Sequence, residues 1–431
     1  MDIVLVFGVL VGLIILGVPV AFSMGLSALT GFLVTGTTEL IPVISQRIYS
    51  GGTSFVLIAI PFYIFSGLLM NGAGMTNALV KASDVLVGKI PGGLAHVNVL
   101  VSMLFAGMSG SSVADATGTG VVEIKMMEDA GYDTRFAAAV TAASATIGPV
   151  IPPSIPFVVF GAITGVSVGK LFMGGLIPGV FMGIAMMVTV YITAKKRNYP
   201  TSGNVYGFKD GLIALLKGIV PMGSFILIMV GISTGIFTPT EAAIVACLYG
   251  LFIGYVVYKE LDFSKLKEII AETVRNTARV VFIMAMAAAY AYALTIMRVP
   301  QRLSMMMTSV ANQPWLFLLV FNALLLLLGC FMETISVMTL ITPIVLPIAI
   351  SIGINPIHLG VVMTLNLMIG QLTPPVGILL YSVASVTRLS MKDLLSELWP
   401  YIVALFVVLV LITYIPSIVM FLPDILIGRG F

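Results

Sequence analysis

Two stretches of small and polar residues interrupt an otherwise strongly apolar chain, and they are the part of the sequence best suited to binding chemistry. The first is Gly107–Gly120 (GMSGSSVADATGTG), and the second is Ile147–Ser154 (IGPVIPPS). Inside a membrane, non-helical backbone is tolerated only where protein buries it or where it lines a cavity. Two ordinary surface loops are the simpler interpretation, but the recurrence of the pattern argues against it.

The same pattern returns 222 residues further along the chain. Ile147-Gly148 matches Ile369-Gly370, and Pro152-Pro153 matches Pro374-Pro375, since 374 − 152 = 222. The same offset relates four more identical pairs, which are Gly107 and Gly329, Gly131 and Gly353, Lys170 and Lys392, and Pro178 and Pro400. These identities predict two diverged copies of one unit. Interrupted apolar segments at corresponding positions of two halves indicate the binding site of a secondary transporter.

The composition places the chain in a membrane and excludes several function classes. Of its 431 residues, 59% are hydrophobic and 9% are charged, against about 25% charged in soluble domains. The two cysteines and two histidines are scattered, so neither a disulfide framework nor a metal centre is predicted. The chain has no phosphate-binding Gly-x-x-x-x-Gly-Lys-Ser/Thr loop and no catalytic motif, and its net charge of +3 is small. We therefore expect no enzyme, ATP-driven pump or nucleic-acid-binding protein.

The polar stretches have apolar arms of half-membrane length on either side. Each arm around the first stretch has about 12–16 residues and reaches only partway across a hydrocarbon core of about 30 Å. Such arms predict a re-entrant hairpin, followed by a span broken at 148–154. The second half predicts the same pair at 314–352 and 357–387. The expected fold is an all-α polytopic membrane protein with two repeats, each holding a re-entrant helical hairpin and a broken transmembrane helix.

The hairpins and broken spans are expected to form a transport core, at 94–170 and 314–390. The scaffold then comprises 1–93 and 171–313, and a terminal span lies within 391–431. Amphipathic arms at 38–50 and 262–279 are expected in the membrane interface, the second followed by a span at 280–297. Residues 2–37 are long for one span and short for two, so we favour two helices broken near Pro19 over one tilted helix.

The basic residues predict an orientation. When the loops around 81–89, 125–135, 195–217, 259–279 and 388–392 are placed in the cytoplasm, five of the 21 Lys and Arg remain outside, namely Arg47, Lys170, Arg298, Arg302 and Arg429. The positive-inside rule favours this arrangement. The two hairpins then enter the membrane from opposite sides, so the repeats are expected to be inverted.

Each hairpin tip and its neighbouring break could bind sodium. Prolines remove amide donors and disfavour helix before them, which predicts free carbonyls at Gly148, Val150, Ile151, Gly370, Leu372 and Thr373. Unwound carbonyls and hydroxyls coordinate sodium in secondary carriers. The first site is predicted to comprise Ser109, Gly110, Ser111, Ser112, Gly148, Val150, Ile151 and Pro153. The second comprises Gly329, Cys330, Glu333, Thr334, Gly370, Leu372, Thr373 and Pro375. Simple proline kinks satisfied by Ser or Thr are the alternative.

A carboxylate substrate is expected between the two tips. The second arm of each hairpin begins there, and helix N-termini attract anions. The predicted substrate residues are Ser111, Ser112, Asp115, Ser154, Thr334 and Ser336. Ser112-x-x-Asp115 is also typical of a capping box, so Asp115 is predicted either to cap its helix or to couple ion and substrate. The role of Glu333 is open in the same way.

Along essentially its whole length, the sequence resembles the large membrane subunit of tripartite ATP-independent periplasmic (TRAP) transporters, within a superfamily of elevator carriers. The motifs that carry the resemblance are GMSGSSVAD from Gly107, IGPVIPPS from Ile147 and GQLTPPVG from Gly370. The resemblance implies sodium-driven uptake of a carboxylate, such as sialic acid or a C4-dicarboxylate, across the bacterial inner membrane. It also implies two partners, a small four-helix membrane subunit and a periplasmic substrate-binding protein, and no cofactor besides sodium. A symporter that needs no binding protein, or a channel or scaffold, is the alternative.

Overall fold

The computed structural model describes residues 2–204, 206–302 and 313–428, without the side chains of residues 2 and 107–109. Helices make up nearly all regular structure in this part of the chain, and it contains no strand. Among the described residues, seven helices are long and apolar enough to cross a membrane, and eight shorter apolar helices accompany them. The predicted all-α polytopic class is confirmed.

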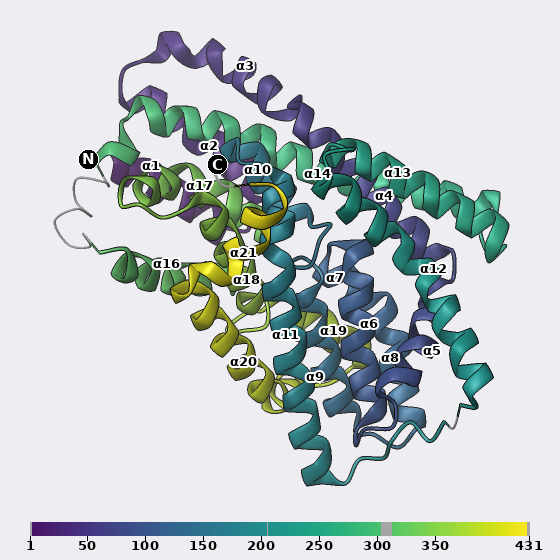
Figure 1. Cartoon of the computed structure of the whole chain (residues 1–431). Helices are drawn as coiled ribbons and strands as arrows, with labels where there is room; N and C mark the ends of the chain where they lie inside the picture. Colours follow the sequence, from purple (N-terminus) through teal and green to yellow (C-terminus); the bar gives the residue numbers. More distant parts are fainter. Residues whose placement is uncertain (1, 205, 303–312, 429–431) are drawn as a thin grey trace.

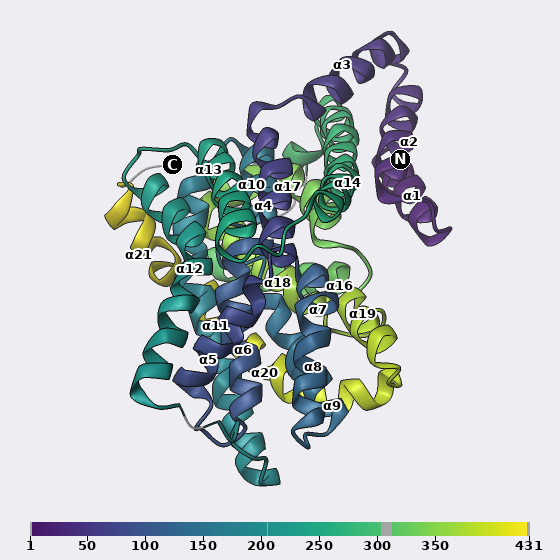
Figure 2. The same cartoon turned by 90° about the vertical axis from the view of Figure 1, so that its right-hand side faces the viewer.

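The N-terminal segment forms two helices, as favoured from the sequence. α1 (Asp2–Ile15) and α2 (Val20–Val34) are separated at Gly17, which has a left-handed φ of 82°, and at Pro19, which precedes α2. Proline disfavours helix at the residue before it, which explains the break. The two helices lie side by side at one edge of the molecule (Figure 2).

The two predicted arms have different structures. α3 (Ile41–Gly52) is a separate helix that ends before the 3₁₀ turn Phe55–Ile58 and α4 (Ala59–Gly72). The second arm and its following span form one continuous helix, α14 (Phe263–Ile296), so the predicted division at 280 is wrong. The first arm ends at Gly51-Gly52, whereas α14 contains neither glycine nor proline. α3 and α14 pack together along one side of the molecule (Figure 1).

Two helical hairpins occupy the predicted positions. The first consists of α6 (Gly93–Ser109), α7 (Ser112–Thr117) and α8 (Thr119–Asp129), and its tip is Gly110-Ser111. The second consists of α16 (Pro314–Gly329) and α17 (Thr334–Ser351), with its tip at 330–333. The second arm is interrupted at Gly118 in the first hairpin and continuous in the second.

Two interrupted helices follow the hairpins, again as predicted. α9 (Thr134–Ser144) leads through a 3₁₀ turn and the Pro152-Pro153 break into α10 (Ile155–Thr164). α18 (Pro356–Gly370) leads through the Pro374-Pro375 break into α19 (Ile378–Thr387). Every residue of α18 and all residues of α9 from Phe136 to Ser144 are buried. The broken helices therefore form the centre of the molecule.

The remaining helices pack around this centre. They are α5 (Met75–Val87), α11 (Val168–Arg197), α12 (Phe208–Ser233), α13 (Pro239–Phe252), α20 (Met391–Tyr414) and α21 (Pro416–Leu426). The predicted terminal span is thus two helices, because Pro416 begins a new one. Helix bounds recur at the sequence offset: α7 and α17 begin at 112 and 334, and α9 and α18 begin at 134 and 356.

Candidate functional site: a pocket between two hairpin tips

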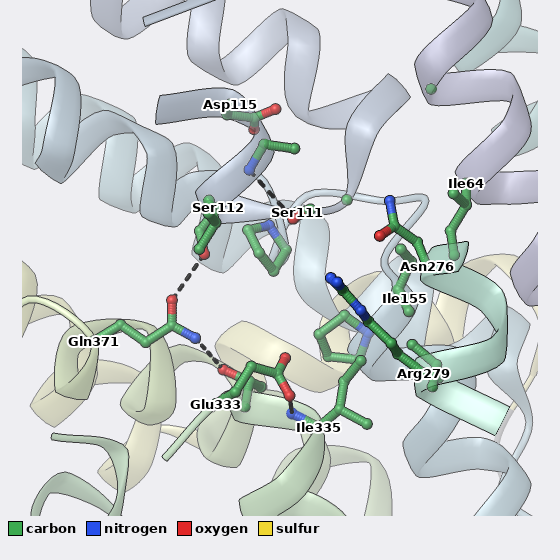
Figure 3. Close-up of a pocket in the computed structure, with 18 of the residues that line it drawn as sticks. Ile64, Ser111, Ser112, Asp115, Ile155, Asn276, Arg279, Glu333, Ile335 and Gln371 are labelled. Atoms are coloured by element: carbon green, nitrogen blue, oxygen red, sulfur yellow. Dashed lines mark hydrogen bonds between the residues drawn. The ribbon is translucent and has the colours of Figure 1, made fainter. Parts of the chain in front are cut away.

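A pocket of about 590 Å³ lies where the two hairpin tips meet (Figure 3). One side is built from the first tip and the start of α10, and another from the second tip and the end of α18. Helices α4 and α14 supply the remaining wall through Ile64, Asn71, Glu272, Asn276 and Arg279. The pocket is therefore shared between segments predicted as core and segments predicted as scaffold.

The first tip turns sharply and packs against the first break. Gly110 has a left-handed φ of 61°, and a Cβ at this position would lie 3.1 Å from the Pro153 carbonyl oxygen. Ser111 then caps α7, because its side chain accepts a hydrogen bond of 3.4 Å from the amide of Ala114. The structure thus joins the first tip and first break as predicted, although the side chain of Ser109 lies outside the described residues.

Asp115 lies in the first turn of α7 and is only 3% exposed. A Cβ on Gly148 would lie 2.5 Å from Asp115 Oδ2, so this carboxylate stands directly beside the first break. The N-cap of α7 is Ser111 and not Ser112, so Ser112 and Asp115 do not form the capping box considered above. The coupling role of Asp115 stays a prediction.

The first break leaves several backbone oxygens without helical partners. No described backbone amide donates to the carbonyls of Gly148, Val150 or Ile151. Ser154 caps α10 by accepting from the amide of Phe157, and it donates to the carbonyl of Pro149. Ser154 is fully buried and does not line the pocket, so it supports the wall behind it.

Glu333 caps the second arm at the second tip. Its carboxylate accepts hydrogen bonds of 3.1 and 3.3 Å from the amides of Ile335 and Ser336. These are the amides that the sequence argument assigned to a substrate carboxylate. The second tip also contacts the second break, since the amide of Gly377 donates to the carbonyl of Cys330 at 2.9 Å. A Cβ on Gly370 would lie only 2.8 Å from the Cα of Gly329.

The second break differs from the prediction at one residue. The carbonyl of Gly370 accepts from both the amide and the hydroxyl of Thr373, at 3.0 and 2.9 Å. It is therefore already satisfied by the tight turn, and the expectation of a free Gly370 carbonyl is wrong. No described backbone amide donates to the carbonyls of Leu372 and Thr373.

A glutamine connects the two tips, and the sequence argument missed it. The Ser112 hydroxyl donates to Gln371 Oε1 at 2.8 Å, and Gln371 Nε2 donates to the Thr334 hydroxyl at 2.8 Å (Figure 3). Gln371 is 2% exposed and lines the pocket. The one feature of the sequence that indicated a role for Gln371 was its position inside the motif GQLTPPVG, which begins at Gly370.

Helix α14 contributes a second group of missed residues. Arg279, Asn276 and Glu272 lie one helical turn apart and line the same pocket. Arg279 is the one cationic side chain among the described lining residues, and Figure 3 shows it extending toward the space between the tips. Their spacing is that of an amphipathic helix, which is why the sequence predicted an interfacial arm here.

Comparison with known proteins identifies the family. A family model described as "Tripartite ATP-independent periplasmic transporter, DctM component" matches residues 7–418. The sialic acid TRAP transporter large permease protein SiaM of Vibrio cholerae is 41% identical over 99% of both chains. The C4-dicarboxylate TRAP transporter large permease protein DctM of the same species is 36% identical, again over 99% of each. The chain belongs to the TRAP transporter large permease family.

Further comparisons agree with this TRAP permease assignment. The sialic acid TRAP transporter permease protein SiaT of Haemophilus influenzae is 40% identical over 97% of this chain but only 68% of its own length. The solved structure of the YdaH transporter of Alcanivorax borkumensis shares the fold, with a TM-score of 0.62 at 14% identity over 88% of each chain. The relatives are permeases and not enzymes, and this permease is a multi-pass protein of the bacterial inner membrane.

The pocket of this TRAP permease gathers part of the predicted site. The predicted residues that line it are Gly110, Ser111, Ser112, Asp115, Glu333, Thr334 and Ser336. The others lie outside the lining, in or beside the breaks and the second tip, namely Gly148, Val150, Ile151, Pro153, Ser154, Gly329, Cys330, Gly370, Leu372, Thr373 and Pro375. The lining thus combines hydroxyls with the carboxylates Asp115 and Glu333, whereas the backbone oxygens of the two breaks lie behind it.

Proposed function

We propose that this TRAP permease performs sodium-coupled uptake of an organic acid anion that a periplasmic substrate-binding protein delivers. The observation that carries the proposal is the pocket between the two hairpin tips, with hydroxyl donors and Arg279 in its wall. Relatives are named for sialic acid, C4-dicarboxylates and 2,3-diketo-L-gulonate, all of which carry a carboxylate. Sialic acid is the first acid to test, because SiaM has the higher identity.

The anion would be bound by side chains more than by helix ends. Ser111, Ser154 and Glu333 already accept from amides in the first turns of α7, α10 and α17. A guanidinium binds a carboxylate through two parallel hydrogen bonds, which assigns Arg279 to the substrate. The Thr334 hydroxyl would donate from the opposite side of the pocket.

Two sodium sites would lie behind the pocket, one at each tip and its break. The carbonyls of Gly148, Val150 and Ile151 support the first, with Asp115 beside them to offset the charge. The carbonyls of Leu372 and Thr373 support the second. Monovalent ions in carriers are coordinated by such unwound backbone, and a neighbouring carboxylate inside a membrane is a functional candidate.

An elevator mechanism with inverted repeats accounts for the arrangement of the helices. α11 and α20 begin at 168 and 391, close to the 222-residue offset, yet they run antiparallel. Arg197, the last residue of α11, pairs with Glu397 near the start of α20 at 2.8 Å. Equivalent helices with opposite directions are the expected sign of inverted repeats. The moving core would comprise 94–170 and 314–390, and the scaffold would be braced by α3 and α14.

The proposed partners are a small four-helix membrane subunit and the binding protein. The match covers 68% of SiaT, so about one third of SiaT lies outside the matched part, which leaves room for such a subunit within one chain.

The proposal is tested by uptake into proteoliposomes that contain the permease, its small subunit and its binding protein. Labelled sialic acid and labelled succinate are supplied outside under an inward sodium gradient. We expect saturable uptake of one acid that needs all three proteins and stops when choline replaces sodium at fixed pH. Saturable uptake without the binding protein would instead favour the simpler symporter. Non-saturable flux of both acids would favour a channel.

A further inference from the structure

We propose that Gln371 gives one hydroxyl at each hairpin tip opposite hydrogen-bonding polarity, so that Ser112 offers its lone pairs to a cation and Thr334 offers its proton to an anion. This inference rests on the proposed function. Gln371 would act as a positioning residue, because it works through the hydroxyls of Ser112 and Thr334. The proposal depends on which group donates in each of the two hydrogen bonds, and not only on the presence of the bonds.

Ser112, Thr334 and Gln371 differ in how they are placed in the 222-residue repeat. Ser112 and Thr334 are equivalent positions, since 334 − 112 = 222, and each is the first residue of its hairpin's second arm. Gln371 has no counterpart, because the residue 222 positions earlier is Pro149. One asymmetric amide therefore bridges two equivalent hydroxyls. Ser112 is 4%, Thr334 2% and Gln371 2% exposed, so water does not replace these bonds freely.

The direction of the bonds determines what each hydroxyl can still do. Ser112 gives its only proton to Gln371 Oε1, which leaves its oxygen lone pairs as acceptors. Thr334 accepts from Gln371 Nε2, which leaves its proton available, and no described acceptor receives that proton. Both residues line the pocket. Ser112 is thereby suited to a sodium ion, and Thr334 is suited to a carboxylate.

An amide is the one side chain of this length that imposes such a difference. Glutamate at 371 would accept from both hydroxyls, so Thr334 would turn its proton away from the pocket. Methionine would offer neither bond and would leave both hydroxyls to rotate. A role in packing alone would make Gln371→Glu affect the sodium and substrate half-saturation concentrations equally, whereas a polarity role would make it affect them differently.

The test is a double-mutant cycle between Gln371→Glu and Thr334→Val in the three-component uptake assay with labelled sialic acid. Thr334→Val alone should raise the half-saturation concentration of the acid roughly tenfold or more, as for one lost hydrogen bond to a charged group. Gln371→Glu alone should raise it comparably while the sodium half-saturation concentration stays level or falls. In the Gln371→Glu background, Thr334→Val should then raise the half-saturation concentration of the acid less than about twofold, because Thr334 no longer donates to the acid.

Asn366→Leu is the matched control. Asn366 is a buried amide five residues earlier on α18, it bonds Asn322 of α16, and it does not line the pocket. It should change neither half-saturation concentration. Should Gln371→Glu fail to reach the membrane, Thr334→Val is measured in the Gln371→Met background, where it should raise the half-saturation concentration of the acid clearly less than in the parent, because the Thr334 hydroxyl can rotate there; an equal rise in both backgrounds would refute the role.

The outcomes separate the two proposals. If the parent takes up the acid without any dependence on sodium, the proposed function and this inference both fail. If uptake by the parent depends on sodium but Thr334→Val raises the half-saturation concentration of the acid equally in the parent and in Gln371→Glu, only the role of Gln371 fails. The added negative charge of Gln371→Glu cannot mimic the expected result, because charge repulsion would leave the cost of Thr334→Val unchanged.

Discussion

The two tip-and-break units differ most in their charges. The first carries the buried carboxylates Asp115 and Glu123, and the equivalent positions 222 residues later are Val337 and Val345. α17 forms a continuous arm with the valines, so the carboxylates are not needed to build such an arm. They instead occupy the arm that is interrupted at Gly118. The second unit instead carries its carboxylate, Glu333, at the tip, where it caps α17, so only the first unit holds buried carboxylates within its second arm.

The largest effect is expected from Asp115→Asn, which tests this difference between the two units. Removing a buried charge beside the first break should raise the sodium half-saturation concentration roughly 100-fold or more, on the scale measured when one member of a buried pair is lost. Sodium-dependent uptake of labelled acid measures it. Glu123→Gln is the matched control, since Glu123 is buried in the same hairpin but does not line the pocket. Equal effects of both variants would mean that the hairpin needs charge for folding only.

Loss of a single neutral ligand should have a smaller effect, and it should be similar in the two units. Ser112→Ala and Thr373→Val each remove a hydroxyl near one proposed sodium site but leave the carbonyls. Each should raise the sodium half-saturation concentration roughly 5- to 150-fold, as for 1–3 kcal/mol of lost polar interaction. Saturating sodium should restore part of the rate. If both variants keep the parental sodium dependence, the two-site assignment is wrong.

The tight packing of the units predicts a difference in stability. Gly370→Ala places a methyl group 2.8 Å from the backbone Cα of Gly329, which cannot move without shifting a helix. Gly148→Ala places it 2.5 Å from a carboxylate oxygen of Asp115, which can rotate. We expect Gly370→Ala to destabilise the protein by about 1–3 kcal/mol and Gly148→Ala by clearly less. The thermal unfolding midpoints of the purified variants measure this, and the reverse order would contradict it.

The sequence predicted elements better than contacts between them. Apolar runs interrupted by Gly110, Pro153 and Pro375 placed the hairpins and breaks correctly, because helix length and helix breaking are local properties. The role of Gln371 was not predicted because its partner Ser112 lies 259 residues away, and no local pattern encodes such a hydrogen bond. The place of Arg279 in the pocket was not predicted because the polar face of a helix has the same sequence pattern whether it contacts water or lines a pocket.

The helix caps show the same limit at the level of single atoms. The composition of the second tip suggested an anion site at the start of α17, but Glu333 occupies the amides of Ile335 and Ser336. A carboxylate at a helix N-terminus is favourable whether it belongs to a ligand or to the protein. The sequence predicted that a carboxylate would bind at the start of α17, and the fold shows that it is the side chain of Glu333.

The smallest effect is expected at the ion pair between equivalent helices of the two halves. Arg197 of α11 meets Glu397 of α20 through two contacts, of 2.8 and 3.0 Å, at 39% and 16% side-chain exposure. Such pairs contribute about 0.2–1 kcal/mol, so Glu397→Gln should lower the unfolding midpoint slightly, and less so at high salt. The control is Asp393→Asn, which removes a single, more exposed contact of 3.5 Å to Arg135.

Uptake should remain at the parental rate in Glu397→Gln and Asp393→Asn, because apolar packing between α11 and α20 holds their antiparallel arrangement. Leu398, Leu405 and Met186 are buried in the same core, and none of them depends on the ion pair. A several-fold loss of uptake in Glu397→Gln with little loss of stability would contradict this expectation. It would mean that α11 and α20 move relative to each other during transport, and the boundary between core and scaffold would then have to run between them.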